Sequence, residues 1–407
     1  MAGSNSNNHP AAHDKSRNVG QFVVSPQLKT VYSILIFVGL AGLVVGLMRD
    51  PSRTWMAYLV SFFYFITLAL GGLFFAAVQH VTLAGWSVNV RRISESLSAF
   101  LPFGAIAGAI FWVGAPKLYI WLDAAKVAES EVLTHKASYL NGTFFTIRLI
   151  LFFALWLVFK KLLVGASVKQ DENGDERLTE KMLKRGIAFL LIFAITYSFF
   201  AIDMLMSIDP TWFSTIFGIY AFAGLFQSTM AFMILIILYL HKKNLLVGIV
   251  NENHLHDLGK FLFAFTVFWC YIAFSQYMLI WYANLPEETK FIIPRTEGQW
   301  LPLSLLLLIG KFFVPFLALM PRWAKRTPTH LAAISIWVLA MQYLDIYWLV
   351  YPAKYSTEVH FGLYEICVYA GFLGVFLFAV SRFLSRHNLI PIRDPRIEES
   401  MHHHVTY

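Results

Sequence analysis

The chain has 407 residues, of which 58% are apolar, 17% aromatic and only 14% charged. Soluble domains carry about a quarter charged residues, so this composition excludes an ordinary soluble enzyme and is typical of an integral membrane protein. The formal net charge of +8 comes largely from basic residues in tails and connections, and it gives no reason to expect nucleic acid as a partner.

Apolar stretches long enough to cross about 30 Å of hydrocarbon recur along the chain. The predicted fold is therefore an all-α membrane bundle of ten helices, which occupies residues 31–385. Residues 1–30 and 386–407 are expected to form polar tails. In chain order, the predicted spans are 31–48, 56–84, 96–115, 140–164, 186–207, 214–240, 258–283, 300–320, 331–351 and 362–384.

The basic residues orient this predicted bundle. Of the 32 Lys and Arg residues, 22 fall in the two tails and in the connections after the second, fourth, sixth and eighth spans. Cytoplasmic segments of membrane proteins carry such an excess of basic residues. Both termini are therefore predicted to be cytoplasmic. The first thirty residues contain no apolar signal-peptide core, so we expect the first span to be retained.

A weak internal similarity links the second and sixth spans. TLALGGLFFAAVQH in one and IYAFAGLFQSTMAF in the other share an Ala/Gly–Leu–Phe core. Duplicated units are common in membrane carriers, so the chain could contain two four-helix units plus two extra helices. Chance similarity between apolar strings is the alternative.

Five charged residues inside the apolar spans are the main functional signal. A charge at mid-bilayer depth costs about 2.5–3.5 kcal/mol on insertion scales, so it is rarely kept without a partner or a task. Lys311 lies nearest the middle of its span, and the others fall toward the outer half. The five residues are Arg148, Asp203, Lys311, Asp345 and Glu365.

This set has two interpretations. Buried acids can accept and relay protons, so the set could mark a proton path in which Gln342 shares a helix face with Asp345. Alternatively, the charges form structural ion pairs, for example Arg148 with Asp203. For Lys311, both Asp345 and Glu365 are candidate partners.

A deeper polar group, which includes His80 and Tyr197, could continue a proton path toward the cytoplasm. Polar side chains at such positions can equally serve to join neighbouring helices.

Ligands for redox cofactors are scarce in the spans. A transmembrane haem needs two axial ligands, whereas His80 is the only histidine well inside a predicted span. Cys270 and Cys367 are too few for an iron–sulfur cluster or an attached haem. We therefore expect this chain to hold no metal and no redox cofactor by itself.

Two strings are more specific. Phe199–Gly224 reads FFAIDMLMSIDPTWFSTIFGIYAFAG, and Phe274–Thr289 reads FSQYMLIWYANLPEET. They resemble signature segments of the smaller polysulfide-reductase-type (NrfD-like) membrane subunit of bacterial alternative complex III, often called ActF. The resemblance covers essentially the whole chain, and that family also implies ten helices, cytoplasmic termini and no haem ligands.

The resemblance implies a subunit of a quinol:cytochrome c oxidoreductase in a bacterial inner membrane. Its partners would be a larger NrfD-like subunit with the working quinol site, and subunits that carry haem c and iron–sulfur clusters. A terminal oxidase is a further candidate partner. The smaller subunit would supply scaffold and a proton path, or keep a vestigial site for quinone. Asp203 matches the acid of the family's Asp…Trp-x-x-Thr-Ile-Phe segment, and Trp212 and Tyr277 complete the candidate quinone-binding residues.

A stand-alone secondary transporter is the alternative function. Ten helices with buried charges also suit that class, in which spans are often interrupted at mid-depth. Lys311–Pro315 is the one good candidate for such an interruption. A third alternative is a purely structural subunit, whose ion pairs only hold the bundle together.

Overall fold

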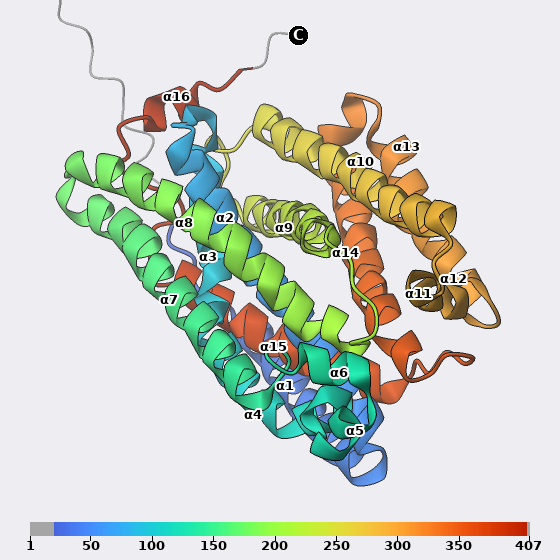
Figure 1. The fold of residues 1–407 in the computed structure, drawn as a ribbon. Helices are drawn as coiled ribbons and strands as arrows, with labels where there is room; N and C mark the ends of the chain where they lie inside the picture. The colour runs from blue at the N-terminus through green and yellow to red at the C-terminus, as the bar shows by residue number, and fades with distance from the viewer. Residues whose placement is uncertain (1–19, 405–407) are drawn as a thin grey trace, which may run out of the picture.

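A computed structural model describes residues 20–404 (Figure 1). All regular secondary structure in this part of the chain is helical, and ten of the helical segments are long and apolar enough to cross a membrane. The predicted all-α bundle of ten spans is thus confirmed. Residues 1–19 and 405–407 of the two expected tails lie outside the described residues.

Eight spans are single helices and two are composite. The third span joins α3 (Val88–Leu97) to α4 (Leu101–Leu118), and the eighth joins α12 (Trp300–Leu307) to α13 (Val314–Leu319). The single-helix spans are α1 (Pro26–Arg49), α2 (Pro51–Val81), α7 (Gly142–Asn173), α8 (Arg177–Met204), α9 (Phe217–Lys242), α10 (Glu252–Ala283), α14 (Pro328–Val350) and α15 (Leu363–Leu384).

Local signals set several helix ends. The side chains of Ser25, Asp50 and Asn141 accept hydrogen bonds from the first-turn amides of α1, α2 and α7. Such caps satisfy backbone donors that have no partner within the helix. Proline at the first position of α1 and α2 loses no helical hydrogen bond there.

The spans pack as two four-helix groups and one pair. We call the first group unit A; it contains α2, α4, α7 and α8. Unit B contains α9, α10, α14 and the composite span α12–α13. The remaining spans, α1 and α15, pack closely against each other and against α2. This grouping matches the predicted two units plus two extra helices. α2 lies at the centre, and nearly all of its residues are buried.

The two ends of the bundle differ. One end, which we call the terminal face, holds residues 20–25, residues 385–404 and the short helix α16 (Ile397–Met401), seen at the top of Figure 1. The other end, the loop face, holds α5 (Ala124–Glu129), α6 (Glu131–Lys136) and α11 (Pro286–Thr296). These short helices lie in the connections between the third and fourth and between the seventh and eighth predicted spans.

Several helices extend beyond the predicted apolar spans. α7 and α8 continue to a turn at 174–176, where Gly174 adopts a left-handed conformation. The third span also begins earlier than predicted, so Arg91 and Arg92 were wrongly assigned to a connection and are buried in α3. Hydropathy predicts only the apolar part of a helix, so it does not include these charged turns.

Candidate functional site

Lys311 lies in an irregular part of the eighth span. Residues Leu308–Phe313 form a π-helical segment between α12 and α13, and Pro315 follows it. π-Helical turns change the direction of nearby side chains and occur often at functional sites. Here the segment carries a lysine whose side chain is fully buried.

The ammonium group of Lys311 is held by two residues of α14. Its Nζ donates to Asp345 Oδ2 at 2.5 Å and to Gln342 Oε1 at 2.6 Å. Gln342 and Asp345 are three residues apart on one helix face, as the sequence predicted. Nζ also lies 4.3 Å from the centre of the Trp269 ring of α10, a cation–π distance.

The second carboxylate oxygen of Asp345 completes the arrangement. It accepts a short hydrogen bond from the hydroxyl of Tyr220, on α9. All four spans of unit B therefore contribute a side chain to one buried cluster. We call Lys311, Asp345, Gln342, Tyr220 and Trp269 the Lys311 cluster.

An apolar cavity of about 610 Å³ borders this cluster, between α10, α11, α12 and α14. Tyr220, Trp269 and Asp345 form part of its wall. Phe274 and Leu305, which also line it, are exposed, so the cavity opens on the apolar outer surface of the bundle. A mostly apolar pocket with a few convergent polar groups is typical of a small-molecule site.

Arg295 of α11 is the second charged residue in this wall, and the sequence prediction missed it. Its guanidinium lies 3.6 Å from the Phe291 ring centre and donates to three backbone carbonyls, those of Phe291, Trp348 and Leu349. No carboxylate among the described residues forms an ion pair with it. Arg295 was overlooked because it lies in a connection and outside every apolar span.

Arg148 and Asp203 form a separate pair in unit A. Arg148 donates to both carboxylate oxygens of Asp203, at 2.8 and 3.0 Å, and the Tyr139 hydroxyl donates to one of them at 2.9 Å. The guanidinium also lies 3.9 Å from the Tyr139 ring centre. This pairing confirms one of the predicted ion pairs. Both carboxylate oxygens of Asp203 accept hydrogen bonds from these two residues.

Glu365 has its own partners, so it is not the partner of Lys311. It accepts from Arg53 of α2 at 2.7 and 2.8 Å, from Tyr351 at 2.7 Å and from the amide of Gly362 at 2.8 Å. The last bond caps the start of α15. Arg53 was predicted to lie in a connection, and the structure places it in the first turn of α2.

The structure does not bring the three predicted quinone-binding residues together. Asp203 is paired in unit A, and Trp212 is stacked on Phe291 with ring centres 3.8 Å apart. Of the three residues, only Tyr277 lines the cavity, and Asp345 is another residue of that cavity's wall. The residues diverge because Asp203 and Tyr277 lie on spans of different units.

Tyr197 and His80, the residues predicted to continue a proton path toward the cytoplasm, lie in different parts of the bundle. The Tyr197 hydroxyl donates to the carbonyl of Ala221 at 3.2 Å, and thereby joins α8 to α9. His80 is buried at the end of α2, close to the terminal face. No hydrogen bond found in the described part of the chain links either residue to Lys311.

A second buried charge network lies beneath the terminal face. Arg92 donates to Glu95 at 2.9 Å and to Asp171 at 2.6 Å, and Arg91 pairs with Asp394 of the C-terminal segment. Although burial opposes it, the neighbouring Arg91 keeps the pKa of Asp394 below its ordinary value. The predicted C-terminal tail is therefore fastened to the bundle as far as the structure describes it.

No protein-family model matches the chain, and no curated protein matches it either. Within residues 20–404, no group of three or more His, Cys, Asp or Glu side chains is placed to hold a metal ion. The Lys311 cluster and the cavity beside it are the features of this structure that bear most directly on function.

Proposed function

We propose that the chain is a membrane subunit of a quinol-oxidising respiratory complex, in which the Lys311 cluster handles protons beside a quinone-sized cavity. One observation carries this proposal: Asp345 bonds to both Lys311 and Tyr220 and also lines the cavity of about 610 Å³. The resemblance to NrfD-like subunits of alternative complex III supports the same function.

The cluster contains groups suited to proton transfer. Quinol oxidation releases protons as well as electrons, and a carboxylate at the cavity wall can accept a proton. When Asp345 takes up a proton, Lys311 loses its counter-charge and favours release of its own proton. Tyr220 and Gln342 hold the two groups in place during this exchange.

The cavity suits a quinone in shape and polarity. Its apolar walls fit a quinone ring and an isoprenoid tail, and its opening on the apolar surface of the bundle allows entry from the bilayer. Arg295, Tyr277 and Gln276 supply polar groups in the wall. Electrons would leave through haem c and iron–sulfur clusters on partner subunits in a bacterial inner membrane, with both termini of this chain cytoplasmic.

Cys270 offers a direct test of binding, because its side chain lines the cavity whereas Cys367 lies between α1 and α15. We expect a quinone analogue to slow alkylation of Cys270 by N-ethylmaleimide and to leave Cys367 unchanged. Equal alkylation rates of Cys270 with and without the analogue would show that quinone does not bind in this cavity.

The function is tested in the complex purified from native membranes in mild detergent. Haem- and cluster-bearing subunits should co-isolate with the chain. Asp345→Asn should lower quinol oxidation by about 10²-fold or more, the usual contribution of an acid–base group. Asp203→Asn, which removes an equally buried acid away from the cavity, should have the smaller effect. The reverse order of the two variants would place the chemistry in unit A.

A secondary transporter remains the second candidate, because the π-helical segment at Leu308–Phe313 interrupts a span at the charged site. Transporters bind substrates at such breaks. A chain that purifies alone and moves a solute in proteoliposomes, with transport lost in Lys311→Met, would favour this candidate.

A further inference from the structure

We propose a binding site for an anionic phospholipid between α1 and α15 at the terminal face. The phosphate would lie among three basic side chains, and the acyl chains would enter an apolar cavity one turn deeper. This inference is independent of the proposed function, because the site shares no lining residue with the Lys311 cluster or its cavity.

The headgroup part is a pocket of about 390 Å³. Lys29 of α1, Arg382 of α15 and Arg386 line it, and no acidic side chain does. None of the three bases forms an ion pair with any residue in the described range 20–404. The hydroxyl of Tyr32 provides a further donor to a phosphate, whereas those of Ser381 and Ser385 donate to the backbone carbonyls of Leu377 and Arg382.

The acyl part is an apolar cavity of about 250 Å³ between α1, α4 and α15. Its one polar lining group, the hydroxyl of Tyr58, is already donated to the carbonyl of Ala107 at 2.9 Å. The rest of the wall is aliphatic or aromatic, so the cavity offers nothing to a polar ligand.

The two cavities follow each other along one groove. Phe378 lies between them, with its ring 5.5 Å from that of Tyr32 above and 6.0 Å from that of Phe103 below. Ile36 and Val375, which line the apolar cavity, lie one turn further into the membrane on the same two helices. A phospholipid has a charged headgroup followed by two apolar acyl chains, which is the same order as the basic pocket and the apolar cavity in this groove.

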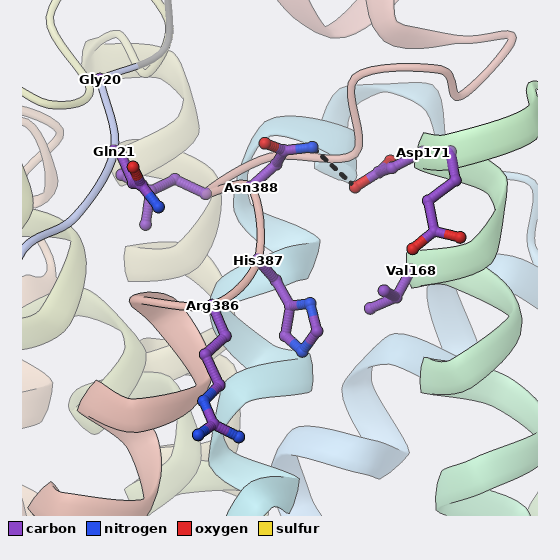
Figure 2. Close-up of a pocket in the computed structure, with 9 residues that line it drawn as sticks. Gly20, Gln21, Val168, Asp171, Arg386, His387 and Asn388 are labelled. Carbon is purple, nitrogen blue, oxygen red and sulfur yellow. Dashed lines mark hydrogen bonds between the residues drawn. The ribbon is translucent and has the colours of Figure 1, made fainter.

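A neighbouring pocket shows why the site is specific to this groove. Figure 2 shows that pocket, where Asn388 bonds Asp171 and the Arg386 side chain extends in another direction. Asp171 and Glu172 line it together with Arg386 and His387, so this pocket presents acidic as well as basic side chains to a ligand. The groove between α1 and α15 combines three bases that form no ion pair within residues 20–404 with an apolar extension, and basic pockets between spans bind anionic headgroups.

The test measures lipid retention by native mass spectrometry of the purified full chain. After delipidation, the protein receives phosphatidylglycerol or phosphatidylcholine of the same acyl chains. We expect clear preference for phosphatidylglycerol, lowered by about fivefold for each base removed in Lys29→Gln, Arg382→Gln and Arg386→Gln. A control variant with three exposed bases of α7 and α8 removed, K161Q/K169Q/K181Q, should keep the preference.

Glycerol 3-phosphate separates a lipid from a soluble phosphate compound. Because it lacks acyl chains, it should not displace phosphatidylglycerol. Displacement by glycerol 3-phosphate at equal concentration, equal retention of the two lipids, or an unchanged preference in the variant with all three groove bases replaced would each overturn the proposal.

Discussion

Lys311 can remain buried because its charge is matched on every side. Asp345 supplies the counter-charge, Gln342 a second acceptor and Trp269 an aromatic face. Removing one partner of such a pair leaves the other charge buried without compensation, whereas removing both leaves none. The pair should therefore be sensitive to single changes and tolerant of a double one.

We expect Lys311→Met or Asp345→Asn to lower the free energy of unfolding by about 3–5 kcal/mol each, and the double variant to lose less than either. Thermal or denaturant unfolding in detergent measures these differences. A double variant that loses the sum of both single effects would show that the two groups do not interact.

At the scale of the element, α1 is held mainly by its close contact with α15, and to a smaller extent by contact with α2. A Cβ atom on Gly39 would lie 2.1 Å from the Cα of Gly371, so only glycine fits at this crossing. Small residues allow such close approach of helices in membranes, where packing drives association.

Gly39→Ala should accordingly push α1 away from α15 and lower the free energy of unfolding by about 1–3 kcal/mol. Gly165→Ala is the matched control, because a Cβ there meets nothing within 4 Å. It should be neutral or stabilising, since alanine favours a helix over glycine. Equal melting temperatures for both variants would contradict this account of the α1–α15 contact.

The ion pair between Arg91 of α3 and Asp394 is one of the contacts that hold the C-terminal segment on the bundle. Asp394 has a lowered pKa in the folded protein, so its contribution to stability is present above the unfolded pKa of about 3.9 and is lost as the pH falls below it. Arg91 would then be left buried and without this partner.

We expect Asp394→Asn to imitate this acid effect at neutral pH. Amides of residues 389–401 should exchange hydrogen roughly tenfold faster, because a hydrogen bond between charged groups is lost. Glu398→Gln, an exposed change in the same segment, should leave exchange unchanged. If Asp394→Asn also leaves it unchanged, other contacts hold the segment.

At the scale of the whole molecule, an even number of spans places residues 20 and 404, the ends of the described range, on the terminal face. The excess of basic residues predicts that this face is cytoplasmic. The two native cysteines lie within spans, which permits cysteine labelling in a background without them.

Single cysteines at Gln21 and His404 should react with an impermeant maleimide only after the cells are permeabilised. Cysteines at Ser138 and Glu358, on the loop face, should react in intact cells. Labelling of Gln21 and His404 in intact cells would reverse the predicted orientation.

Hydropathy alone determined the number of spans and identified five buried charges, because the cost of placing a residue in hydrocarbon is local and additive along the chain. It could not find Arg295, which lies in a connection, or Arg91 and Arg92, which precede the apolar stretch of their span. Helix lengths beyond the hydrocarbon were likewise invisible to it.

The tertiary structure decided which charges pair and which of them meets a cavity. Asp345 and Glu365 were equivalent candidates for Lys311, and only the contact between the eighth and ninth spans selected Asp345. The π-helical segment also contributes, because it changes the direction of the Lys311 side chain from that of a regular α-helix. The hydrophobic periodicity of the sequence does not reveal this change. Pairing depends on helix faces that meet in space, whereas the sequence reports only the depth at which each charge is buried.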